Sequence, residues 1–155
     1  MRSCFAAFFC AVMLLSPCAF ALQGNSWRAV DLPSRPVAIS ATGSILWACG
    51  ADEMIAESID GGQSWNVKHR SKNGSVLLTI GFADDENGFA AGTGGKLLLT
   101  QDGGATWKPV HTDGNIIYNA SFSDERNGMI QTPSAIEFTH DGGATWSEVS
   151  FLKSE

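Results

Sequence analysis

The sequence predicts an all-β fold, a partial β-propeller of about three four-stranded antiparallel blades. An octet of the form Ser/Thr-x-Asp-Gly-Gly-x-Ser/Thr-Trp begins at Ser58, Thr100 and Thr139, and its tryptophans are 42 and 39 residues apart. Repeats of roughly 20 to 50 residues are typical of solenoids and propellers. Short apolar runs alternate with turn residues about every ten positions, and no stretch has the helical period of about 3.6 residues.

The middle repeat shows the expected order of elements. Strands are predicted over Val76–Phe82, Phe89–Gly92, Lys96–Thr100 and Thr106–Val110, with turns at Asp84–Gly88, at Thr93–Gly95 and at the octet. Pro109 is compatible with the fourth strand, because the outer strand of a blade has a free edge where an N–H is not needed. Each repeat is therefore expected to form one antiparallel sheet.

The octet itself is interpreted as a tight turn. Its aspartate can accept hydrogen bonds from backbone N–H groups of the same turn, and its glycines permit the positive φ angles that a side chain disfavours. The tryptophan can bury a large ring while its N–H finds a partner. The predicted structural set is Asp60, Gly62, Trp65, Asp102, Gly104, Trp107, Asp141, Gly143 and Trp146.

A second turn motif supports the same division of the chain. Phe82–Gly88 and Phe122–Gly128 share the pattern Phe-x-Asp-x-x-Asn-Gly, which the first repeat lacks, as terminal repeats often do. Blades are expected at about 37–68, 76–110 and 116–149. The segment 26–31, with Trp27, is interpreted as a fourth strand without the three that would precede it.

Residues 1–21 are predicted to be a signal peptide, followed by one repeat domain over 22–155. Arg2 precedes an uncharged apolar run, and small residues at 19 and 21 place the cleavage between Ala21 and Leu22. The run is about a dozen residues, whereas a spanning helix needs roughly 20, so no stable membrane span is expected. We therefore expect an exported protein, periplasmic or secreted.

The cysteines fit export without disulfides. Cys4, Cys10 and Cys18 all lie in the predicted signal peptide, which leaves Cys49 alone in an apolar run, where a buried core thiol is expected. Lipid attachment at Cys18 is an alternative, which Pro17 disfavours.

Charge argues against nucleic acid and anionic membranes as partners. Beyond residue 21 the chain has nine basic and sixteen acidic residues, a net charge of −7. An acidic domain with scattered basic residues cannot neutralise phosphates, which dominates nucleic-acid affinity.

No catalytic, cofactor or metal site is predicted. The only tyrosine, Tyr118, is interpreted as a strand residue. The histidines, His69, His111 and His140, lack metal-ligand spacing. Arg35-Pro36 resembles in part the Arg-Ile-Pro element near the start of sialidases, but the isoleucine is absent. The protein is predicted not to be an enzyme and to need no cofactor.

The octets resemble the Asp-box (BNR) repeats of sialidases and other propellers. The longer pattern from Phe82 to Trp107 is similar to the photosystem II stability/assembly factor family, and the resemblance covers residues 26 to 150. The resemblance implies Asp-box hairpins and a propeller fold. It also implies an exported protein whose role is unassigned. In photosynthetic members it also implies an arginine-rich patch for a membrane-protein partner. Here the arginines beyond residue 21 do not cluster in sequence, so a photosystem partner is not supported; they are Arg28, Arg35, Arg70 and Arg126.

We expect a non-enzymatic repeat scaffold for protein or ligand binding, either assembly-factor-like or a fragment of a longer propeller. The alternative is a remnant or subunit of a sialidase-like glycoside hydrolase. Three blades are fewer than the four to eight or so of a closed propeller. Open blade faces are therefore expected to bind a protein partner or a second copy. One hypothesis is a six-bladed dimer with Trp27 strands inserted in trans, and its rival is a truncated longer product.

Overall fold

The computed structural model describes residues 31–110 and 114–150. The predicted signal peptide, the cleavage site, Trp27 and His111 lie outside these residues. Within them the chain forms three four-stranded antiparallel sheets, which confirms the predicted fold class.

The first sheet contains β1 (Pro36–Thr42), β2 (Ile45–Gly50), β3 (Ile55–Ser58) and β4 (Asn66–His69). The second contains β5 (Leu77–Phe82), β6 (Gly88–Gly92), β7 (Leu97–Thr100) and β8 (Lys108–Val110). The third contains β9 (Asn119–Phe122), β10 (Gly128–Gln131), β11 (Ala135–Thr139) and β12 (Ser147–Ser150). We call the three sheets blades 1, 2 and 3.

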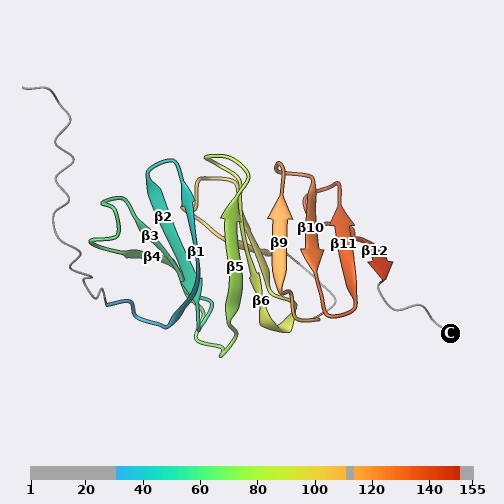
Figure 1. Ribbon diagram of the computed structural model, residues 1–155, viewed down its shortest axis with the longest axis horizontal. Helices are drawn as coiled ribbons and strands as arrows, with labels where there is room; N and C mark the ends of the chain where they lie inside the picture. Colours follow the sequence, from blue (N-terminus) through green and yellow to red (C-terminus); the bar gives the residue numbers. More distant parts are fainter. Residues whose placement is uncertain (1–30, 111–113, 151–155) are drawn as a thin grey trace, which may run out of the picture.

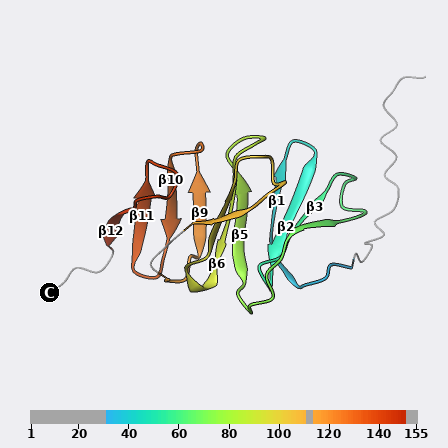
Figure 2. The same ribbon diagram turned by 180° about the vertical axis from the view of Figure 1, so that it is seen from behind.

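The blades stand in a row, with blade 1 at one end and blade 3 at the other (Figures 1 and 2). Their first strands, β1, β5 and β9, are neighbours, whereas β4, β8 and β12 are the outer strands. Pro109 lies in β8, which pairs only with β7, as its missing N–H requires.

Two apolar cores fill the spaces between successive blades. Between blades 1 and 2, Trp47, Cys49 and Ile55 pack with Ile80 and Leu98. Between blades 2 and 3, a second set is buried: Phe89, Ala91, Leu97, Ile117, Ala120, Phe122 and Ile130. In both cores one blade contributes one face of its sheet and the next blade contributes the opposite face. This arrangement follows from strand alternation, because successive side chains point to opposite faces.

The turn predicted at Thr93–Gly95 is a single 3-10 turn between β6 and β7, with positive φ at Gly94 and Gly95. The predicted fourth strand of blade 2 is shorter than expected, since Trp107 precedes β8.

Candidate functional site

The box of blade 2 shows how the octet makes its turn. Asp102 accepts hydrogen bonds from the Thr106 backbone N–H at 2.8 Å, from the Thr106 hydroxyl at 2.5 Å and from the Thr100 hydroxyl at 2.7 Å. The Thr100 hydroxyl oxygen accepts the Gly104 N–H at 2.9 Å, and the Trp107 indole donates to the Gly104 carbonyl at 3.1 Å. All of these hydrogen bonds stay within the turn.

The other two boxes repeat the hydrogen bonds of the aspartate. In blade 1, Asp60 accepts the Ser64 N–H at 2.9 Å and the Ser64 hydroxyl at 2.6 Å. In blade 3, Asp141 accepts the Thr145 N–H and hydroxyl at the same two distances. Two further backbone bonds tie boxes to the other turn of their blade, from Gly103 to Glu86 and from Gly142 to Arg126.

The box carboxylates are strongly ionised. Hydrogen bonds from the hydroxyl and N–H of the residue four positions later lower the pKa of Asp60, Asp102 and Asp141 to about 2. A general acid or base needs a pKa closer to the working pH. Across residues 31–110 and 114–150, no group of three or more His, Cys, Asp and Glu side chains is placed to hold a metal ion. Each box aspartate is thus hydrogen-bonded within its own octet.

The glycines of the boxes allow close contact between blades. Gly104 has φ of +84°, and a Cβ built on it would lie 2.2 Å from the ring of Trp47 in blade 1. That ring stacks on Phe82 at 4.9 Å and meets Trp107 edge-on at 6.2 Å. The box of blade 2 is thus part of the core between blades 1 and 2.

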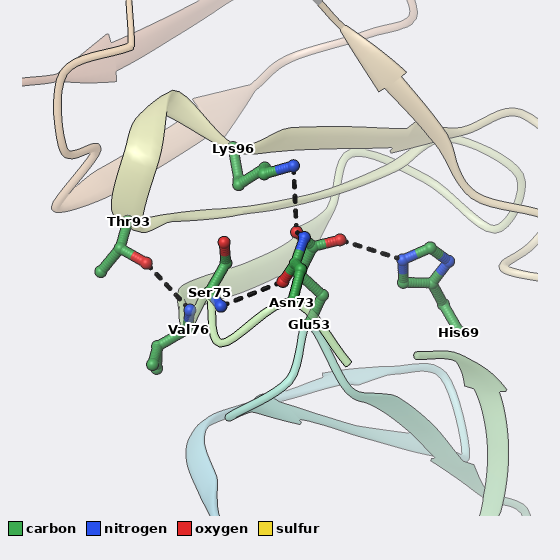
Figure 3. Close-up of polar contacts among 7 residues, drawn as sticks. All are labelled: Glu53, His69, Asn73, Ser75, Val76, Thr93 and Lys96. Carbon is green, nitrogen blue, oxygen red and sulfur yellow. Dashed lines mark hydrogen bonds and ion pairs between the residues drawn. The ribbon is translucent and has the colours of Figure 1, made fainter. Parts of the chain in front are cut away.

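A polar cluster joins blades 1 and 2 at another corner, and sequence reasoning missed it (Figure 3). Glu53, in the turn between β2 and β3, is almost buried, with 5% of its side chain exposed. It accepts a hydrogen bond from Asn73 at 2.6 Å, and pairs with Lys96 of blade 2 at 3.1 Å. His69 Nε2 lies 3.6 Å from the second carboxylate oxygen. Burial raises the pKa of Glu53, but the hydrogen bonds from Asn73 and Lys96 outweigh it and leave the pKa below its usual range.

The backbone of this corner is strained. Asp52 and Glu53 have φ of 60° and 52°, a region that side chains disfavour by roughly 1–2 kcal/mol per residue. In blade 2 the corresponding positions, before the third strand, are Gly94 and Gly95 with φ of 68° and 66°. A signal was therefore present in the sequence, since an Asp-Glu pair stands where the next repeat has Gly-Gly. Partners on both carboxylates, including Arg70 on Asp52 at 2.9 Å, stabilise this strained turn.

The other candidate residues lie apart from one another. Tyr118 is 52% exposed just before β9, and its N–H donates to the Gln131 carbonyl. His140 is exposed in the blade 3 box, with Nδ1 2.8 Å from the Asn127 side-chain oxygen. Cys49 is fully buried in β2, and burial raises its pKa to about 12, so its thiol is protonated at neutral pH.

The end faces of the row are the remaining candidate surface. On blade 1, the cross-strand row Ile39, Ala48, Ala56 and Val67 points away from blade 2. Ile39 is 80% exposed and Val67 38% exposed, whereas Ala48 and Ala56 between them are buried. We call this surface the first face. On blade 3, the rows that point away from blade 2 are Ser121, Met129, Phe138 and Ser147, and Asn119, Gln131, Ile136 and Val149. We call this surface the last face; Met129 is 45% exposed and Val149 59% exposed.

The three stacked sheets and their boxes define a BNR-repeat protein of the β-propeller type. A family model described as photosynthesis system II assembly factor YCF48 matches residues 70–154. The chain belongs to this family.

Curated relatives with matching segments are cyanobacterial photosystem II assembly lipoproteins named Ycf48. The protein of Synechococcus sp. (strain CC9902) is 32% identical over 97 residues, which are 59% of this chain and 29% of that protein. The protein of Prochlorococcus marinus (strain NATL2A) is 50% identical over 36 residues, 23% of this chain and 11% of that protein. The chain thus spans less than a third of the relatives it matches.

Solved structures share the fold. YCF48 bound to D1 peptide has a TM-score of 0.70 at 24% identity, covering 83% of this chain and 44% of that one. YCF48 from Cyanidioschyzon merolae has a TM-score of 0.67 at 20% identity, covering 81% and 44%. An ancestral GH74 enzyme has a TM-score of 0.63 at 15% identity, covering 75% and 18%. In the part of the chain that the structure describes, no helix is long and apolar enough to cross a membrane.

Proposed function

We propose that this chain is an exported, non-enzymatic scaffold that binds protein through the open faces of its blades. Residues 1–21 act as its signal peptide, and residues 22–155 form one repeat domain with structural boxes. The partner is another protein or a second copy of the chain. The lipoprotein names of the two curated relatives support export, and a family structure bound to a D1 peptide supports a protein ligand.

The observation that carries the proposal is the contrast between boxes and end faces. The box aspartates are hydrogen-bonded within their own octets, whereas Ile39, Met129 and Val149 expose apolar surface on sheet faces. Contiguous apolar surface on a folded protein marks an interaction site.

Glycoside hydrolysis of the sialidase kind receives no support from the residues it would need. The Tyr118 N–H donates to the Gln131 carbonyl, and Arg70 is paired with Asp52. Arg126 belongs to a turn of blade 3, whereas Arg35 precedes β1. A likeness to a glycosidase at 15% identity concerns the fold alone.

Capture of partners from envelope extract tests the proposal. Immobilised wild-type protein is expected to bind a partner protein saturably. The Ile39→Glu and Met129→Glu variants are each expected to lose this binding, because each places a charge on an apolar face. Ile59→Glu is the matched control, since Ile59 is 74% exposed in the blade 1 box, off both faces.

Equal capture by all four proteins would contradict binding through the faces. Turnover of a glycoside panel that is abolished by Tyr118→Phe would contradict the non-enzymatic role.

A further inference from the structure

We propose that Asn73 is a site of spontaneous covalent modification, where the chain converts an asparagine into aspartate or isoaspartate without an enzyme. The site lies in the bend between β4 and β5, at the corner where blades 1 and 2 meet (Figure 3). Three asparagines precede glycine, the residue that least obstructs this reaction; they are Asn73, Asn87 and Asn127. The structure distinguishes the first of them from the other two.

The reaction joins the side chain of Asn73 to the backbone of the next residue. The Gly74 nitrogen attacks Cγ of Asn73, so that the new N–Cγ bond closes a cyclic imide and the Cγ–Nδ2 bond breaks. Nδ2 leaves as ammonia and takes the proton that the Gly74 nitrogen loses. Water then opens the imide at either carbonyl. In total NH is exchanged for O, and nothing is oxidised or reduced.

A hydrogen bond folds the Asn73 side chain over Gly74. The Ser75 N–H donates to Oδ1 of Asn73 at 3.0 Å. This bond closes a ring that contains both Cγ and the Gly74 nitrogen, which holds the two reacting atoms near each other. The same N–H stabilises the negative charge that develops on Oδ1 when Cγ is attacked. Among the described residues nothing accepts the Gly74 N–H, so no hydrogen bond has to break before its nitrogen reacts.

The side chains of the other two asparagines are held in a different direction. Nδ2 of Asn87 donates to both carboxylate oxygens of Asp84, at 3.0 and 2.9 Å. Nδ2 of Asn127 donates to both carboxylate oxygens of Asp124 at the same two distances. Each amide is thus bound to a residue that precedes it in the chain, whereas the amide oxygen of Asn73 is bound to a residue that follows it.

The glycines after the three asparagines differ as well. Gly74 is exposed, with φ of +81° and nothing within 4 Å of a Cβ built on it. Gly88 and Gly128 begin β6 and β10, and a Cβ on them would collide with the rings of Phe82 and Phe122. Closure of an imide at these two positions therefore requires a strand to open first.

The modification changes the corner between blades 1 and 2. Nδ2 of Asn73 donates to Oε1 of Glu53 at 2.6 Å, and Nζ of Lys96 lies 3.1 Å from the same oxygen. Conversion replaces this donor by a second carboxylate, next to a Glu53 side chain that is only 5% exposed. A lost hydrogen bond and the repulsion of like charges are both destabilising, so the modified chain is expected to be less stable.

Peptide mass spectrometry tests the inference. The purified full-length chain is incubated in mildly alkaline buffer and digested, and the exchange of NH for O is followed in the three Asn-Gly peptides. The Asn73 peptide is expected to convert at least about tenfold faster than the Asn87 and Asn127 peptides, because strand opening limits those two. In urea the three rates are expected to agree within about threefold, since the unfolded chain removes the difference in geometry.

Equal rates at the three sites in the folded chain, or no conversion of Asn73, would overturn the inference. So would a preference for Asn73 that persists in urea, because it would then come from the local sequence alone.

The Asn73→Asp variant tests the effect of the product. Its urea midpoint at neutral pH is expected to be lower than that of the wild type. Gln101→Glu is the control, because it adds the same charge at an exposed position in the box of blade 2. Equal midpoints for the wild type and Asn73→Asp would overturn the predicted effect on the corner, and so would an equal loss in the control.

Discussion

The aspartates of the boxes are the residues that most invite a catalytic interpretation, and their hydrogen bonds argue for a turn-making role. Asp102 accepts three hydrogen bonds from Thr100 and Thr106, all within one octet. Asp124, in the turn between β9 and β10, is held in the same way by Asn127 and the Arg126 N–H. Its pKa is also lowered to about 2.

These carboxylates predict how stability depends on pH. Their folded pKa of about 2 lies below the ordinary value of 3.8, so the ionised form favours the folded state. Their stabilisation is fully present above pH 3.8 and is lost as the pH falls through about 2. The urea midpoint of the wild type is therefore expected to fall between about pH 4 and pH 2.

The Asp102→Asn variant provides the comparison. One of the four carboxylates is then absent, so its urea midpoint should be lower at pH 7 and should fall less on acidification. Parallel loss of stability in both proteins would show that Asp102 does not contribute through its charge.

At the scale of elements, the box glycines matter for contacts between blades as well as for turn geometry. Gly104→Ala adds a methyl group against the ring of Trp47 at a φ of +84°. Strained backbone and overpacking together are expected to cost about 3 kcal/mol of unfolding free energy, measured by urea denaturation. Gly43→Ala is the control, since Gly43 also has a positive φ but nothing lies within 4 Å of its added Cβ. An equal loss in both variants would mean that the contact with Trp47 contributes nothing.

The strands could be predicted from the sequence because turn residues within each repeat mark where the strands end. The octets and the Asp84–Gly88 turn give the blade boundaries through local chemistry. The Glu53 cluster could not be predicted in this way, since its partners Asn73 and Lys96 lie 20 and 43 positions further along the chain. They meet only when blade 2 stacks on blade 1. The strained Asp52-Glu53 turn would have been visible only by aligning it with Gly94-Gly95.

At the scale of the whole molecule, the described residues form three blades, and each end blade has one uncharged sheet face that contacts no other described blade. The sequence predicted that such faces exist, but it did not show which residues they expose. Strand register supplies that information, because it puts Ile39 in the position of Ile80 and Met129 in the position of Trp47. The rows that build the cores between blades are thus repeated at the two ends of the described row of blades.

The central claim is that the boxes build the fold while the end faces bind. Its most direct test measures partner capture by the immobilised Asp102→Asn variant. The quantity compared is the amount of envelope extract that gives half-maximal capture, at a temperature where the variant keeps its native circular dichroism spectrum. The expected result is a value within about twofold of the wild type, because the box contributes no group to either face. Loss of capture by this folded variant would contradict the claim and would place the box carboxylate in contact with the partner.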